Sequence, residues 1–81
     1  MELDRITFAP AVMQGKPCVR GMRISVGLVV NLVANGMSTE EIIEEYPDLE
    51  EEDIRQCLRY AALLTEERIE FYKERAHAIS G

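Results

Sequence analysis

Three basic residues near the N-terminus have the type and spacing to bind an anion. Lys16, Arg20 and Arg23 surround tight turns expected at Gly15 and Gly21. Cationic side chains beside exposed backbone N–H groups make a concave site for a phosphate or a similar anion. A solvated loop carrying the same charges is the alternative interpretation, and the sequence leaves both open.

Two further arginines, Arg55 and Arg59, lie four residues apart in a predicted helix and share one side of it. They have the chemistry to contact a phosphate or a guanine edge. Alternatively, Glu51 pairs with Arg55 in the favourable i, i+4 order and the charges only solvate the helix. Because Glu52 and Asp53 also stand at the start of this helix, they would repel DNA there. Any groove contact is therefore predicted further along the helix or on another element.

Catalysis and metal binding have no candidate residues in this sequence. Cys18 and Cys57 show no Cys-x-x-Cys or Cys/His ligand spacing. We find no Ser/His/Asp or Cys/His arrangement and no glycine-rich phosphate loop. We therefore expect a protein that is not an enzyme and has no cofactor, no metal and no small-molecule substrate. Reduced cysteines indicate a cytoplasmic protein.

Length and composition predict one small globular domain. The chain has 81 residues, of which 47% are hydrophobic and 30% are charged. Domains of this size commonly gain stability by oligomerising, so we expect a homodimer. The N-terminus has no apolar segment of signal-peptide length, and the apolar run from Val26 to Val30 is too short to span a membrane.

The net charge of −6 is unevenly distributed along the chain. Residues 38–53 carry nine acidic and no basic side chains, whereas residues 1–25 carry four basic and two acidic ones. Phosphate binding needs clustered Lys and Arg, so the net charge argues against nucleic acid. The concentration of acid in one block still leaves room for a basic surface elsewhere.

The first quarter of the chain is predicted to be β or extended structure. Short apolar segments occur at Ile6–Phe8, Ala11–Met13 and Cys18–Arg20, interrupted by Pro10 and by a Gly/Pro sequence at residues 14–17. This pattern predicts two short strands around a Gly/Pro turn.

Two helices are predicted in the middle of the chain. The segment Val26–Asn35 is apolar on nearly every side, follows the N-cap residue Ser25 and precedes Gly36, which is suited to a left-handed C-terminal position. The second helix, Ser38–Tyr46, opens with a capping box in which Glu41 pairs with the cap. Short connections place these helices next to each other.

A third helix is predicted from Glu51 onward. Its expected inward face consists of Ile54, Cys57, Leu58, Ala61 and Ala62, with Leu64 close by. At Thr65 the helix either continues or gives way to a separate one. Continuation is favoured by a heptad seam with alternating spacings of four and three, formed by Leu58, Ala62, Thr65, Ile69, Tyr72, Ala76 and Ile79.

These elements predict a mainly α fold: a three-helix helix-turn-helix bundle with a short N-terminal β-hairpin and a C-terminal helical extension. We place the domain at residues 1–64 and the extension at residues 65–81. A plain three-helix bundle has the same short connections, so the pattern is only weakly specific for DNA binding. The hairpin could serve as a wing beside the helices.

The order of several short sequence words resembles the small bacterial family known as domain of unknown function 433. The resemblance runs from about Ile6 to Leu64. The words that carry it are Ile6-Thr7 with Pro10, Gly15-Lys16-Pro17, Gly21-Met22-Arg23-Ile24, Gly36-Met37-Ser38, Glu40-Glu41-Ile42, Tyr46-Pro47, Leu49 and Asp53-Ile54-Arg55 with Leu58, Tyr60, Ala61 and Ala62.

The resemblance implies a winged-helix or homeodomain-like unit that acts as the antitoxin of a VapBC-type module, often encoded beside a PIN-like ribonuclease. Two positions depart from the family pattern: Met22 stands where Thr is usual, and Glu50 stands where Ser or Thr caps the third helix. The second departure removes a capping hydroxyl at a cost of about 1 kcal/mol, unless Asp48 or the acidic first turn compensates.

Two functions of different classes are therefore expected. The first is a dimeric antitoxin that binds operator DNA through Lys16, Arg20, Arg23, Arg55 and Arg59. Its C-terminal helix covers a PIN-like toxin through Ile69, Phe71, Tyr72 and Ile79. The alternative is a small protein-interaction module without nucleic-acid binding, favoured by the net charge and the acidic block.

Overall fold

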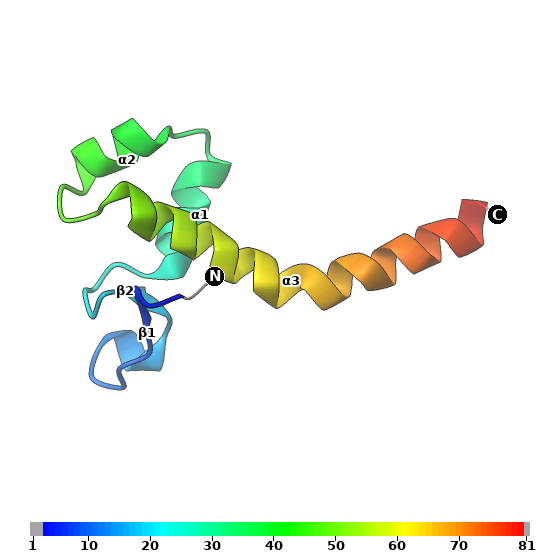
Figure 1. The fold of residues 1–81 in the computed structure, drawn as a ribbon, viewed down its shortest axis with the longest axis horizontal. Coiled ribbons are helices and arrows are strands. Elements are labelled where there is room, and N and C mark those ends of the chain that lie inside the picture. The colour runs from blue at the N-terminus through cyan, green and yellow to red at the C-terminus, as the bar shows by residue number, and fades with distance from the viewer. Residues whose placement is uncertain (1–2, 81) are drawn as a thin grey trace.

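The computed structural model describes the backbone of residues 3–80 and the side chains of residues 3–66. Its elements are β1 (Ile6–Thr7), a 3-10 turn (Met13–Gly15), β2 (Cys18–Val19), α1 (Val26–Ala34), α2 (Thr39–Glu45) and α3 (Glu51–Ser80). One antiparallel hairpin and three helices confirm the predicted mainly α fold. The hairpin, α1 and α2 gather around the first half of α3, and its second half extends away from them (Figure 1).

The N-terminal hairpin is shorter than predicted. Its register pairs Ile6 with Val19 and Thr7 with Cys18. The second strand ends before Arg20 because this residue has a left-handed backbone with φ of +44°. The chain then turns back so that Cys18 forms an isolated bridge with Ser25, which brings the start of α1 against the hairpin.

The strand predicted at Ala11–Met13 does not form, because Ala11 lies in a turn, Val12 lies in a bend and the backbone turns again at Met13. This residue begins a 3-10 turn in which Met13, Gln14 and Gly15 all have positive φ angles. The N–H of Gly15 donates to the Val12 carbonyl at 3.1 Å, and the N–H of Lys16 donates to the Met13 carbonyl at 3.2 Å. These local bonds replace the ladder that a strand would need.

The predicted helix caps of α1 and α2 are confirmed. The Ser25 hydroxyl accepts from the N–H of Leu28 at 3.0 Å, and α1 ends at Ala34, before the left-handed Gly36 with φ of +90°. In α2 the Ser38 hydroxyl accepts from the N–H of Glu41 at 3.1 Å, while the Glu41 carboxylate accepts from the N–H of Ser38 at 2.8 Å. The box satisfies two of the N–H groups that a helix start leaves unpaired.

Helix α3 continues without a break from Glu51 to Ser80, so the alternative of a new helix at Thr65 is excluded. Its start has no capping hydroxyl, because Glu50 precedes it. Instead, the Asp53 carboxylate accepts from the N–H of Glu50 at 2.8 Å. The acidic first turn therefore supplies the compensation that the sequence left open.

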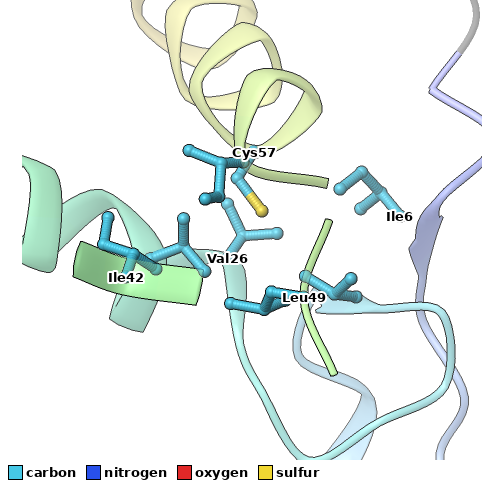
Figure 2. Packing of buried hydrophobic residues seen from close by; sticks show 8 residues of the cluster. Ile6, Val26, Ile42, Leu49 and Cys57 are labelled. Carbon is cyan, nitrogen blue, oxygen red and sulfur yellow. The ribbon is translucent and has the colours of Figure 1, made fainter. Parts of the chain in front are cut away.

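The hydrophobic core joins the hairpin, all three helices and the connection between α2 and α3. Its buried members are Ile6, Val19, Val26, Val29, Ile42, Leu49, Ile54 and Cys57. The labelled side chains converge from separate elements on one volume beneath the first turns of α3 (Figure 2). Helix α1 packs against both α3 and α2, so the core holds the first half of α3 in place.

The expected inward face of α3 is only partly correct. Ile54 and Cys57 are buried, but Leu58 and Leu64 are 39% and 63% exposed, Ala61 is half-buried and Ala62 is exposed. The side of the helix that faces the hairpin instead buries two polar residues, Asp53 and Gln56. Among the described residues of α3, Leu58, Ala62, Leu63 and Leu64 are therefore exposed, while the buried side combines two apolar and two polar residues.

Candidate binding surfaces

A buried carboxylate ties the hairpin to the start of α3. Asp53 is fully buried and accepts from Arg20 Nε at 3.0 Å, Arg20 Nη2 at 2.8 Å and Arg5 Nη1 at 3.1 Å. Burial by itself would raise the pKa of the Asp53 carboxyl. The hydrogen bonds from Arg20, the Glu50 backbone and Arg5 outweigh burial and hold this pKa below its ordinary value.

Arg20 is therefore already paired with a buried carboxylate, and its assignment as a DNA-binding residue stays a prediction. Besides its two bonds to Asp53, its Nη2 donates to the Asp48 carbonyl at 2.6 Å. Arg5, which the sequence analysis missed, bonds Glu50 as well as Asp53. Moving Arg20 onto DNA would leave a buried carboxylate with fewer partners, which is costly.

Gln56 extends the same polar cluster to the N-terminal segment. Its Oε1 accepts from the N–H of Arg5 at 2.9 Å, and its Nε2 donates to Asp4 at 2.8 Å and to Glu52 at 3.2 Å. Among the described residues, no buried side-chain nitrogen or oxygen lacks a hydrogen-bond partner. The cluster is thus internally satisfied, and its geometry is that of a structural clamp. We refer to Arg5, Arg20, Asp53 and Gln56 as the Asp53 clamp.

The turns at Gly15 and Gly21 do not offer the exposed N–H groups predicted for an anion site. The N–H of Gly15 is used within the 3-10 turn. The N–H of Gly21 donates to the Thr7 hydroxyl at 2.8 Å, and the N–H of Arg20 donates to the Arg5 carbonyl at 2.7 Å. An anion at these turns would therefore depend on side chains.

Lys16 and Arg23 are the two predicted cations that the structure brings together. Both are exposed and line an open depression of about 400 Å³ with Pro10, Ala11, Met13 and Gln14. Lys16 also borders a second depression of about 400 Å³ beside the start of α1, lined by Pro17, Ser25, Gly27, Leu28 and Asn31. Neither cation forms an ion pair with a described carboxylate. Their charge is available to a phosphate.

The two arginines of α3 differ in their surroundings. Arg55 lies 3.4 Å from both Glu51 and Glu52, as in the alternative interpretation of helix solvation. Arg59 is exposed and has no described ion-pair partner. Neither arginine lines the depression that holds Lys16 and Arg23, so the five predicted cations do not share one site.

Large apolar side chains are exposed where α3 leaves the rest of the fold. Phe8 is 53% exposed, and Leu63 and Leu64 are 41% and 63% exposed. The Phe8 ring packs on Tyr60 with ring centroids 5.8 Å apart, which adds the loop after β1 to the same surface. We call Phe8, Tyr60, Leu63 and Leu64 the apolar patch. Exposed apolar groups gathered in this way are typical of a surface that binds another protein.

The predicted partner-binding residues Ile69, Phe71, Tyr72 and Ile79 belong to α3. Their side chains lie outside the described ones, so the assignment stays a prediction.

Metal, thiol and membrane chemistry receive no support from the described part of the chain. No group of three His, Cys, Asp or Glu residues there could hold a metal ion. Cys18 and Cys57 are buried free thiols. Burial, together with the charge of Asp53, raises the pKa of Cys57 to about 11, so this thiol stays protonated near neutral pH. None of the described helices is long and apolar enough to cross a membrane.

Comparison with known proteins places the similarity on the compact part of the molecule. A family model described as "Protein of unknown function (DUF433)" matches residues 6–61. The "Uncharacterized protein y4eO" of Sinorhizobium fredii (strain NBRC 101917 / NGR234) is 41% identical over 56 residues, which are 69% of this chain and 25% of that protein. The match thus spans about a quarter of this relative. No solved structure matches the chain.

Proposed function

The chain belongs to the DUF433 family, and we propose that it is an antitoxin-type subunit that binds a partner protein through α3. The observation that supports this proposal is the apolar patch. Leu63 and Leu64 are exposed, whereas the other large aliphatic residues among the described side chains mostly lie in or against the core. Covering such side chains is a favourable contribution to association, at about 25 cal/mol for each Å² of apolar surface.

The continuation of α3 beyond the patch provides the rest of the binding element. A helix of about 16 residues is marginal in water by itself, so a partner that packs along it supplies the missing stabilisation. Amphipathic helices commonly bind by laying an apolar face into a groove. Ile69, Phe71, Tyr72 and Ile79 provide apolar residues for such a contact.

The partner that we propose is a PIN-like ribonuclease, and the chain neutralises it in the cytoplasm. This identity rests on the family resemblance of the sequence. The apolar patch supports the protein-binding part of the proposal: Phe8 and Tyr60 lie within the family match at residues 6–61, and Leu63 and Leu64 lie just beyond it. The shared domain would then serve as the platform for a specific binding helix.

Operator DNA is the second proposed ligand, and Lys16 and Arg23 support it. They share a depression and have no described carboxylate partner, so phosphate binding would break no ion pair among the described residues. Arg59 is a further candidate contact on α3. The pairing of Arg20 and Arg55 with carboxylates favours the alternative, a protein-interaction module without nucleic-acid binding.

Ribonuclease inhibition tests the protein-binding function. The probe is a purified PIN-type ribonuclease encoded beside the gene for this chain, with its RNA cleavage followed as the chain is titrated. We expect inhibition by the natural sequence and at least about tenfold weaker inhibition by Leu64→Glu. Ala34→Glu, which adds the same charge at an exposed position of α1, is the matched control and should inhibit normally. Absence of binding by the natural sequence would contradict the function, and full inhibition by Leu64→Glu would contradict the site.

A mobility-shift titration with the DNA upstream of the gene tests the second ligand. If Lys16 and Arg23 each contact a phosphate, Lys16→Ala and Arg23→Ala should each weaken binding and reduce the salt slope by about one. Arg55→Ala is the control, because that arginine is paired within its own helix. Absence of binding even at low salt would favour the module without nucleic-acid binding.

A further inference from the structure

A second apolar surface lies on the opposite side of α3 from the apolar patch. Leu58 is 39% exposed, and Ala62 and Thr65 are exposed. We call these three residues the α3 seam. Leu58 and Ala62 each precede a patch residue, Tyr60 and Leu64, by two positions. Two positions correspond to about 200° around an α-helix, so one helix presents two separate faces.

We infer that the α3 seam binds a second copy of this chain, with the two helices antiparallel. The centre of the seam consists of small side chains, because Ala61 and Ala62 stand beside Thr65. Small residues let two helices approach closely. The Thr65 hydroxyl lies 3.2 Å from the Ala61 carbonyl and 3.1 Å from the Ala62 carbonyl, and it donates to its own helix. The hydroxyl therefore needs no partner in a dry interface.

The charges beside the seam select the antiparallel direction. Arg59 and Glu66 directly follow Leu58 and Thr65, so they flank the seam on the same edge, and both are exposed. In an antiparallel pair centred between Ala62 and Thr65, Arg59 of each copy lies beside Glu66 of the other. Two equivalent ion pairs form by symmetry.

A parallel pair in register does not provide these contacts. It would place Arg59 beside Ile54 of the second copy, which is buried in the core, and Glu66 beside Ala61. Ile54 and Ala61 carry no charge, so neither can pair with Arg59 or Glu66. Charge complementarity at Arg59 and Glu66 thus distinguishes the two directions, and it identifies a second copy as the occupant.

This dimer leaves the apolar patch uncovered, since the patch is on the other side of the helix. The seam and the apolar patch would therefore occupy different faces of α3, whereas Ile69, Tyr72 and Ile79 continue the heptad spacing of the seam. The inference does not depend on the proposed function, because the dimer is measured with the chain alone. If the ribonuclease does not bind, dimerisation through the seam can still be measured. If the chain is a monomer, binding of the ribonuclease can still be measured.

Sedimentation equilibrium of the full chain tests the seam by charge exchange. We expect a dimer for the natural sequence, and about 30-fold weaker dimerisation for Arg59→Glu or Glu66→Arg alone, since each creates two like-charge contacts. The double variant Arg59→Glu/Glu66→Arg should return to within about twofold of the natural dissociation constant. The matched controls are Arg23→Glu and Glu40→Arg, which make the same charge changes at exposed positions away from α3. A monomer at all concentrations, or single variants that dimerise normally, would overturn the inference.

Disulfide trapping tests the direction separately. A mixture of Ala62→Cys and Thr65→Cys chains should form mainly the mixed disulfide, because position 62 of one helix lies opposite position 65 of the other. Circular dichroism establishes that both variants remain folded. Disulfides formed mainly between two copies of the same variant would indicate parallel helices and overturn the antiparallel arrangement.

Discussion

The two halves of α3 have the same backbone but opposite environments. From Glu51 to Tyr60 the helix is held by the core and by the Asp53 clamp, with Ile54 and Cys57 almost fully buried. From Ala62 to Glu66 every described residue is exposed, and no other described element runs beside the end of the helix (Figure 1). The difference separates stability from binding: the residues that fix the fold lie in the first half, and the exposed patch and seam begin at its end, at Leu58 and Tyr60, and continue into the second.

The two halves also differ in the hydrogen-bond partners of their polar side chains. In the first half, the buried Asp53 and Gln56 find partners on the hairpin and the N-terminal segment. In the second half, Thr65 bonds only to its own helix. Removing Arg5 or Arg20 would leave the buried Asp53 carboxylate with fewer hydrogen bonds. A substitution in the second half leaves no described buried group without a partner. Substitutions should therefore have very different effects on the two halves.

The largest expected effect on stability is that of Asp53→Ala. Removing this carboxylate takes the acceptor from the N–H of Glu50 and leaves Arg5 with only Glu50 and Arg20 with only the Asp48 carbonyl. The change should lower the free energy of unfolding by about 3 kcal/mol. Urea unfolding followed by circular dichroism measures the change. Glu51→Ala, at an exposed acid two positions away, is the control and should change little. Equal stability of both variants would mean that the clamp is dispensable.

Acidification should weaken the same half of the molecule. Because the pKa of Asp53 is lowered in the folded chain, its ionised form stabilises the fold at pH values above the ordinary aspartate pKa of about 3.9. This contribution is lost as the pH falls through the lower pKa of the folded state. Unfolding free energies measured from neutral to acidic pH should therefore decline more steeply for the natural sequence than for Asp53→Asn. Parallel curves would contradict this role of the carboxylate.

A smaller effect is expected where only a local bond is lost. Ser38→Ala removes the hydroxyl of the α2 capping box and should destabilise the fold by about 1 kcal/mol. Ser38→Asp keeps an acceptor at the same position and should restore most of the loss. Thermal unfolding resolves this difference in a chain of 81 residues. A destabilisation as large as that of Asp53→Ala would show that α2 depends on its cap more than on the burial of Ile42.

The smallest effect is expected in the second half of α3. Leu64→Ser should change the free energy of unfolding by less than about 0.5 kcal/mol, because this side chain is 63% exposed. The same substitution should still weaken binding of the proposed ribonuclease. A large loss of stability in urea would mean that the patch is part of the fold, and the contrast between the two halves would fail.

Features that depend on neighbouring residues were the most predictable from the sequence. The caps at Ser25 and Ser38 and the left-handed Gly36 are each determined within about four positions, and all three are confirmed. The three helices with a hairpin are likewise encoded by local periodicity and turns. The short strands were less accurate, since the left-handed backbone at Arg20 follows from contacts that lie elsewhere in the chain.

Long-range features were not accessible in the same way. Arg5 and Asp53 are 48 positions apart, and nothing in the local pattern of either residue indicates the other. The expected face of α3 included Leu58 because periodicity identifies an apolar stripe without showing where the covering elements end. The acidic first turn of α3, which the sequence suggested would repel DNA, contains Asp53, and this residue binds the hairpin side through Arg5 and Arg20.

The burial of Cys18 and Cys57 has a practical consequence for labelling the molecule. Maleimides react with thiolates that solvent can reach, and neither native thiol meets that condition while the chain is folded. A single cysteine introduced on an exposed surface would therefore accept a spin label or a fluorophore without replacement of the native pair. Conversely, the rate at which the unmodified protein takes up such a reagent would report how often its core opens.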